Sequence, residues 1–385
     1  MKSIKFYFFF YLFFLSSTFD AQNIRIGIFN KEKIKNFSFE VKNASYSIYA
    51  DSLFLFSLSS KNKLLISKKD SLIVLKKENQ IIGEFNEIKL IQDSLNSDLT
   101  IIPENFKDKK RNLSGDFKMH LINKELCLIN ILDMPSYLTS VVLSEAGPNK
   151  NEEYYKVQVI LSRTYALKHL NKHKEENFDL CDRVHCQAFK KSFNYKYPAI
   201  LNAVKQTKDL IVVDSAFNLI GAFFHANCGG QTAETNQVWN KKIPYLTSFK
   251  DTFCLKTRQS TWTYKIPKFK WENYFKKHFF LSSKESEVME QLYTFKQPFR
   301  KTFFIDPKYG IPLRDIRSYF KLKSTFFDCF DDGDYITLKG KGFGHGVGLC
   351  QEGAMEMAIN NFTYDEIIRY YFPSTKIMKR QIIMK

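Results

Sequence analysis

The sequence predicts an α+β fold, with a small N-terminal antiparallel β domain followed by a mixed α/β region that carries a β-rich insertion. Within 24–92, short apolar runs such as IRIGIF, SYSIYA and SLIVL are separated by polar residues, as in strands joined by turns. Within 134–173, apolar residues instead recur with helical spacing. We expect three segments: a leader over 1–21, a β-rich domain and linker over 22–115, and the mixed region over 116–385.

The first residues have the layout of a secretory signal peptide. Lys2 and Lys5 precede an apolar run over 6–15, and small polar residues follow before Ala21. The run is too short for a comfortable membrane span, although an uncleaved anchor is the alternative. We therefore expect an exported protein that starts near Gln22 and resides in the periplasm or cell envelope.

The composition limits the classes of partner. The chain has 385 residues, 44% of them hydrophobic, and a formal net charge of +18. This is typical of a folded protein with two or three domains and excludes a largely disordered chain. Positive charge attracts nucleic acids, acidic glycans or membrane surfaces. Because we expect export, we predict no nucleic-acid partner.

The segment that follows the β-rich domain leads into a first helix. Residues 103–116 are polar and basic, and we expect them to form a linker. The strand-like runs FKMHLI and ELCLINIL come next, and Pro135 then suits the first turn of a helix after Asp133 or Met134. One face of this helix carries apolar residues and one acid: Tyr137, Leu138, Val141, Val142 and Glu145.

Glu145 stands out because it extends an apolar stripe. A carboxyl group in apolar surroundings has a raised pKa, so it keeps its proton near neutrality and can donate it. The alternative is a frayed helix end at which the carboxylate is solvated. A longer helix is predicted over 151–173, where Lys156 and Arg163 share a face with apolar residues. These cations either extend toward solvent or position a substrate or the carboxylate.

Two cysteines and two histidines form a candidate metal site. Cys181 and Cys186 are five positions apart, with His173 upstream and His185 between them. Two thiolates and one imidazole would leave one coordination position open, as in zinc sites that bind water or substrate. The spacing differs from the C-x-x-C of most structural zinc sites, and a Cys181–Cys186 disulfide is the alternative.

The stretch GKGFGHGVGLCQEGA, over 340–354, contains five glycines within nine residues. It lacks both G-x-G-x-x-G and G-K-[ST], so it does not indicate nucleotide binding. Bare backbone permits tight turns or the close approach of a ligand, and we expect it to form one wall of a ligand cleft. A cysteine nucleophile, Cys228 or Cys350 paired with His345, is a further alternative.

Five segments in the same order resemble the SpoIID/LytB domain family of stage II sporulation protein D: YLTSVVLSEAGP, EYYKVQVILSRTYAL, FDLCDRVHCQAF, FFHANCGGQTAETNQVWNKKIPYL and GKGFGHGVGLCQEGA. The resemblance implies a lytic transglycosylase that cleaves the MurNAc–GlcNAc bond of denuded, peptide-free peptidoglycan strands and leaves a 1,6-anhydro-muramyl product. The expected partners are these glycan strands and amidases that remove stem peptides. The alternative is a non-catalytic glycan-binding or amidase-enhancing module.

The resemblance also implies roles for individual residues. Glu145 would be the catalytic acid. Zinc, which only some members carry, would be held by His173, Cys181 and Cys186, with His185 as the alternative imidazole. Val157 and Val159 depart from the family's alanines. The positions implied to contact the glycan are Lys156, Arg163, Gln187, Cys228, Gly229, Gly230, Gly344, His345, Gly346 and Gln351.

Overall fold

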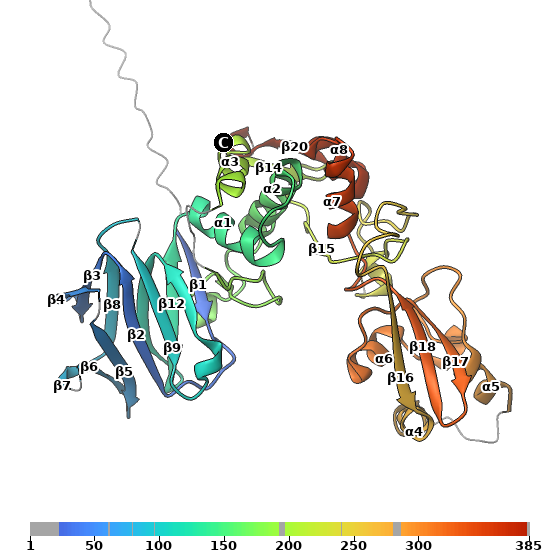
Figure 1. The fold of residues 1–385 in the computed structure, drawn as a ribbon, viewed down its shortest axis with the longest axis horizontal. Helices are drawn as coiled ribbons and strands as arrows, with labels where there is room; N and C mark the ends of the chain where they lie inside the picture. Colours follow the sequence, from blue (N-terminus) through green and yellow to red (C-terminus); the bar gives the residue numbers. More distant parts are fainter. Residues whose placement is uncertain are drawn as a thin grey trace, which may run out of the picture.

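The computed structural model describes residues 23–382 apart from 61, 79, 96, 192–196, 240 and 280–285, so the leader expected over 1–21 lies outside the described residues. The chain forms an arch, with a β-sandwich at one end, a group of helices in the middle and a smaller sheet at the other end (Figure 1). The expected α+β fold is confirmed. Among the described residues, no helix is both long and apolar enough to cross a membrane.

The β-sandwich consists of a seven-stranded and a six-stranded sheet. In spatial order, the first sheet contains β13 (Leu180–Cys181), β1 (Ile24–Ile28), β12 (Glu125–Leu132), β11 (Asp116–Ile122), β8 (Glu87–Gln92), β3 (Ser45–Ala50) and β4 (Leu53–Ser59). The second contains β10 (Arg111–Ser114), β9 (Asp98–Pro103), β2 (Asn36–Asn43), β5 (Lys63–Lys69), β6 (Leu72–Lys77) and β7 (Gln80–Phe85). Alternate residues of β3, namely Tyr46, Ile48 and Ala50, are buried, as expected for a strand with one face on the core.

The segment that we expected to be a linker is part of this sandwich. Residues 103–116 contain a short 3₁₀ helix, η1 (Lys107–Lys109), and then β10, which pairs with β9. Because β10 is an edge strand, a buried Leu113 anchors it while its other side chains stay polar. Strands β11 and β12 also belong to the first sheet. The domain boundary that we expected at residue 115 therefore falls inside the β-sandwich.

The central helices pack around α2 (Glu152–Lys168), which ends before the expected 173 and is buried from Val157 to Leu167. Its neighbours are α1 (Met134–Glu145), α3 (Pro198–Gln206), α7 (Gln351–Ile359), α8 (Tyr364–Tyr371) and β14 (Leu210–Val213), which pairs with β20 (Lys376–Lys379). Helix α1 begins as predicted, because the Asp133 side chain accepts a hydrogen bond from the Ser136 N–H at 2.8 Å and Pro135 lies in the first turn.

The remaining sheet forms a separate lobe with its own core around Trp271. Its strands, in spatial order, are β16 (Thr261–Pro267), β18 (Tyr335–Lys341) and β17 (Phe327–Asp332), and its helices are α4 (Lys268–Phe279), α5 (Ser286–Thr294) and α6 (Leu313–Phe320). The glycine-rich stretch leaves this lobe after β18. It returns to the central helices through β19 (Leu349–Cys350), which pairs in parallel with β15 (Phe224–His225). Four short 3₁₀ helices complete the described chain: η2 (Lys174–Glu176), η3 (Thr235–Gln237), η4 (Pro307–Tyr309) and η5 (Arg380–Ile382).

The N-cap of α1 gives a first prediction. Asp133→Ala removes the acceptor for the Ser136 N–H, and we expect the free energy of unfolding to fall by about 1 kcal/mol. Asp133→Asn keeps a side-chain oxygen at this position and should stay close to the wild type. Urea denaturation of the three proteins measures the difference. Equal stabilities for the alanine and asparagine variants would show that the cap contributes nothing.

Candidate active site

Glu145 is the last residue of α1, and its side chain is half-buried. One carboxyl oxygen accepts a hydrogen bond from the Ala188 N–H at 2.6 Å, so the helix end is not frayed. Burial raises the pKa of Glu145, and the Ala188 hydrogen bond and the Lys190 charge only partly oppose this effect. The C-terminal end of a helix also disfavours a negative charge. The pKa of Glu145 therefore lies above the ordinary glutamate value.

The chain segment that faces Glu145 is held along α1 by further contacts. The Lys190 N–H donates to the Ser144 hydroxyl at 3.0 Å, and the Phe189 ring stacks on the Tyr137 ring with centroids 6.0 Å apart. The Tyr137 hydroxyl donates to the Gln187 side-chain oxygen at 2.8 Å. Gln187 is buried, and its Nε2 has no hydrogen-bond partner within the described part of the chain. The carboxyl of Glu145 thus lies beside a segment that carries an unused amide donor.

The four residues of the candidate metal site come together. The ligand atoms of His173, Cys181, His185 and Cys186 lie within 4.8 Å of one another. His173 Nε2 is 3.4 Å from the Cys186 sulfur, and His185 Nδ1 is 3.8 Å from both sulfurs. Both cysteines are free thiols rather than a disulfide. Because both imidazoles are present, the cluster offers four donor atoms, which would be enough to fill a tetrahedral zinc site.

The surroundings of these donors fit a structural zinc ion. The Nδ1 of His173 contacts the Glu176 carboxylate, an arrangement that orients a metal-bound imidazole. The hydrogen bond between the two thiols lowers the pKa of Cys181 and raises that of Cys186, so one thiolate of the pair is favoured in the absence of a metal. Zinc bound here would hold the segment between His173 and Cys186 in one conformation, directly before Gln187 and Ala188.

The β-sandwich also contacts the segment that carries the metal donors. Strand β13 pairs in parallel with β1, which places Cys181 opposite Gly27. The Asp179 carboxylate accepts hydrogen bonds from the Arg25 backbone N–H at 2.9 Å and from its guanidinium at 2.8 Å. Asp182 forms a buried ion pair with Arg111 at 2.6 Å. The N-terminal strands therefore fix the chain that carries the metal donors and leads to Ala188.

The glycine-rich stretch packs against the protein's own backbone. Gly342, Gly344, Gly346 and Gly348 all have positive φ values. A Cβ at Gly342 would lie 2.6 Å from the Asn227 carbonyl oxygen, and a Cβ at Gly348 would lie 2.3 Å from that of Phe223. Internal packing therefore accounts for the bare backbone, because the protein itself occupies the space beside each glycine: the Asn227–Gly229 turn at Gly342, and His225, Arg300 and Phe223 at Gly344, Gly346 and Gly348. Contact of this stretch with a glycan stays a prediction.

His345 lies on this stretch beside the exposed Trp239 ring. Its Nδ1 accepts a hydrogen bond from the Val347 N–H at 3.1 Å, and burial, followed by the Arg317 charge, lowers the pKa of His345 to about 4. The imidazole is therefore neutral at pH 7. The Trp239 ring lies 5.3 Å from it and is 37% exposed, and Phe343 is 42% exposed. Sequence reasoning missed both aromatic residues, although they stand within the family-like segments.

The two cysteines proposed as alternative nucleophiles are fully buried. Cys228 and Cys350 have no exposed surface. The two residues are in contact, since the Cys228 N–H donates to the Cys350 sulfur at 3.3 Å. A substrate could not reach either sulfur without rearrangement of the chain. The arrangement therefore gives no support to a cysteine–histidine nucleophile at His345.

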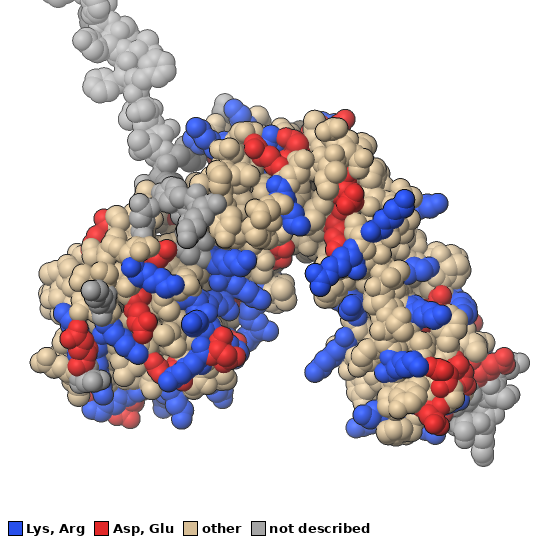
Figure 2. Space-filling view, viewed as in Figure 1, with Lys and Arg blue, Asp and Glu red and all other residues tan. Residues whose placement is uncertain are grey.

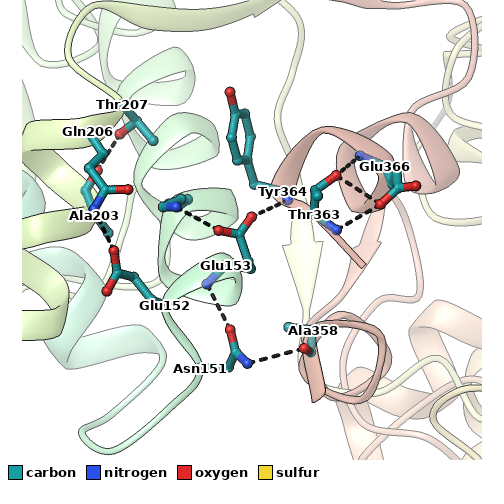
Figure 3. Close-up of polar contacts among 11 residues, drawn as sticks. Asn151, Glu152, Glu153, Ala203, Gln206, Thr207, Ala358, Thr363, Tyr364 and Glu366 are labelled. Carbon is teal, nitrogen blue, oxygen red and sulfur yellow. Dashed lines mark hydrogen bonds and ion pairs between the residues drawn. The ribbon is translucent and has the colours of Figure 1, made fainter. Parts of the chain in front are cut away.

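Lys156 and Arg163, the two basic residues expected to contact the glycan, make contacts that connect α2 to its neighbours. Lys156 forms an ion pair at 2.6 Å with Glu153, whose second oxygen accepts the Tyr364 N–H at 2.7 Å; this connects α2 to α8 (Figure 3). Arg163 is buried and donates to the Thr207 and Leu210 carbonyls at 2.8 and 2.9 Å. These contacts give both side chains a positioning role in the described structure.

Gln351 and Tyr154 connect the Glu145 region to α7. Gln351 is buried at the start of α7, and its Nε2 lies 3.5 Å from the Gln158 side-chain oxygen on α2. Burial raises the pKa of Tyr154, and the charges of Glu145 and Cys350 add to the shift. Tyr154 thus lies near both the end of α1 and the end of the glycine-rich stretch.

The comparisons confirm the resemblance to the SpoIID family. Residues 122–213, which include Glu145 and the candidate zinc ligands, match the SpoIID family model, described as stage II sporulation protein. Stage II sporulation protein D of Bacillus subtilis is 28% identical over 267 residues, covering 64% of this chain and 74% of the relative. An uncharacterized protein of Brachyspira hyodysenteriae is 27% identical over 262 residues, covering 66% and 69%. The amidase enhancer of Bacillus subtilis is 25% identical over 294 residues, covering 62% and 40%.

The metal site gives a second prediction. A protein in which both Cys181→Ser and Cys186→Ser are introduced should hold one zinc ion fewer per chain than the wild type, and its thermal unfolding midpoint should fall because the segment before Ala188 loses its anchor. Native mass spectrometry counts the zinc, and calorimetry measures the midpoint. Cys127→Ser, in β12, is the control and should keep the wild-type zinc content. An unchanged zinc content in the double variant would rule out this site.

Proposed function

We propose that the protein is an exported peptidoglycan lytic transglycosylase that cleaves the MurNAc–GlcNAc bond of denuded glycan strands. The observation that carries this proposal is the half-buried Glu145 carboxyl, whose raised pKa favours the protonated acid. The hydrogen bond from the Ala188 N–H at 2.6 Å holds this carboxyl in one position. Export rests on the signal-like layout of the first residues.

The relatives support a role in the cell wall. Part of the chain matches the SpoIID family model, and its relatives include stage II sporulation protein D and an amidase enhancer. Amidases of the cell wall remove stem peptides, and a strand that has lost its peptides is the substrate proposed here. We therefore place the protein in cell-wall remodelling, together with such amidases.

A single carboxyl group is sufficient for the proposed reaction. Hydrolysis of a glycosidic bond uses two carboxyl groups because water has to be activated. In a lytic reaction, the C6 hydroxyl of the muramic acid attacks its own C1. Glu145 would give its proton to the leaving glycosidic oxygen as that bond breaks, and its carboxylate would then take the proton of the C6 hydroxyl. The 1,6-anhydro bridge forms, and the acid is regenerated.

The shape and charge of the molecule suit an extended anionic glycan. Figure 2 shows a hollow under the arch, with lysine and arginine side chains on the β-sandwich side and on the opposite lobe. Each muramic acid carries a lactyl carboxylate, so a denuded strand is negatively charged and is attracted to basic surfaces. The exposed Trp239 and Phe343 rings offer apolar faces for sugar rings.

A second candidate function is a non-catalytic module that holds denuded strands or stimulates an amidase. The observation that favours it is the 25% identity to a protein named amidase enhancer. The two functions differ in their products, since only the enzyme generates new 1,6-anhydro ends from purified glycan without any other protein present.

The catalytic role gives a third prediction. Glu145→Gln keeps the size of the side chain but removes the transferable proton, and we expect release of 1,6-anhydro-muramyl products to fall by about 10²–10⁴-fold. Mass spectrometry of denuded glycan incubated with each protein measures the products. Glu152→Gln, in the first turn of α2, is the matched control and should retain activity. Wild-type release by Glu145→Gln would remove Glu145 from the mechanism, and intact strands with the wild type would favour the binding module.

The pH dependence gives a fourth prediction. Activity requires protonated Glu145, so it should decline as the pH rises through the pKa of this group, at a higher pH than for an ordinary glutamate. The Lys190 charge favours the ionised form, so Lys190→Gln should raise the pKa of Glu145 further and move the declining limb to higher pH.

The control for this shift is Lys191→Gln, which removes a neighbouring charge of the same sign. Initial rates of product release, measured from pH 4 to 9, give the pH at which the activity of each protein declines. A shift of about one pH unit in this decline is readily resolved. A limb that stays in place in Lys190→Gln, or moves to lower pH, would contradict the assignment of this titration to Glu145.

A further inference from the structure

We propose a second metal site, built from Cys228, Asp251, Cys254 and Cys350, that takes Zn²⁺ or a similar thiolate-binding divalent cation. The ligand atoms of these four residues lie within 4.8 Å of one another, and all four residues are buried. The Cys228 sulfur is 3.3 Å from the Cys254 sulfur and 3.2 Å from Asp251 Oδ2. In a tetrahedral zinc site with Zn–S bonds of about 2.3 Å, neighbouring sulfurs are about 3.8 Å apart, so a small outward shift suffices.

The three thiols come from segments that the fold brings together. Cys228 follows β15, Cys254 lies in the loop before β16, and Cys350 ends β19 and caps α7. The Cys350 sulfur accepts backbone hydrogen bonds from the Cys228 N–H at 3.3 Å and from the Gly353 N–H at 3.4 Å. Backbone donors that point at a sulfur stabilise a thiolate, which is the form that binds a metal.

The carboxyl group in the cluster is oriented by partners outside it. The Tyr371 hydroxyl donates to Asp251 Oδ2 at 2.9 Å, and the Phe253 N–H donates to Oδ1 at 3.0 Å. Such contacts hold a metal-binding carboxylate in place. A buried carboxylate next to thiols is costly without a nearby positive charge. The buried Arg300 guanidinium, which donates to the Cys228 carbonyl, supplies one such charge, and a divalent cation would supply the rest.

A disulfide explains this cluster less completely. The Cys228 and Cys254 sulfurs, 3.3 Å apart, are candidates for such a bond, whose S–S length is about 2.05 Å. That bond would leave the Cys350 thiol and the Asp251 carboxyl buried beside it with no common function. A metal ion uses all four groups at once and requires no oxidant.

The proposed ion would fix the glycine-rich stretch. Cys350 closely follows Gly348, and Cys228 begins the turn that packs against Gly342. The backbone on both sides of His345 would thus be tied to the loop that carries Asp251 and Cys254. The first cluster instead holds the segment that faces Glu145, so the two metal sites would stabilise different segments of the chain.

Zinc content of the purified full chain tests this proposal independently of activity. Native mass spectrometry should find two zinc ions per wild-type chain, and Asp251→Asn and Cys254→Ser should each hold one fewer. Cys127→Ser is the control and should hold two. Since the mass also reveals a disulfide as a loss of two hydrogens, the same spectrum distinguishes the competing chemistry.

The outcomes separate the two clusters. One zinc retained when Cys181→Ser and Cys186→Ser are combined, and lost when Cys254→Ser is added, would support the second site. If the substituted proteins fail to fold, the wild type alone decides: more than one zinc per chain supports the proposal. No more than one zinc per wild-type chain, or a disulfide among the three cysteines, would overturn it.

Discussion

The hydrogen bond from the Ala188 N–H to the Glu145 carboxyl is the contact on which the rest of the proposed site depends. Burial favours the neutral acid, whereas a single backbone donor and the Lys190 charge favour the carboxylate. A group in this balance can both give and take a proton, provided that the donor keeps its position. The position of Ala188 is therefore as important to the proposed chemistry as the identity of Glu145.

Much of the surrounding architecture fixes that position. The segment before Ala188 is paired with β1, linked to Arg25 and Arg111, and carries four convergent metal donors. The segment after it is bound to α1 through Ser144 and Tyr137. The N-terminal sandwich lies mostly outside the family-model match. Through these contacts it holds in place the segment that faces Glu145.

The features that the sequence predicts well are local ones. The start of α1 follows from Asp133 and Pro135, and the strand pattern follows from alternation within short runs. The linker prediction for 103–116 is wrong because an edge strand can form with a single buried apolar residue, here Leu113. Spacing could not show that His173 and His185 both reach the two thiols, nor that the glycines make room for a turn that is distant in the chain, because local patterns carry no information on such contacts. The cluster of Cys228, Asp251, Cys254 and Cys350 depends on the same long-range folding.

The most direct test of the proposed chemistry is the pKa of the Glu145 carboxyl in the folded protein. Carbon NMR of protein labelled at the glutamate side-chain carboxyl, with the signal assigned by its absence in Glu145→Gln, follows this group through a pH titration. We predict a pKa above the usual glutamate value of about 4.3. A pKa at or below that value would mean that Glu145 is ionised near neutrality, and it could not then serve as the proton donor.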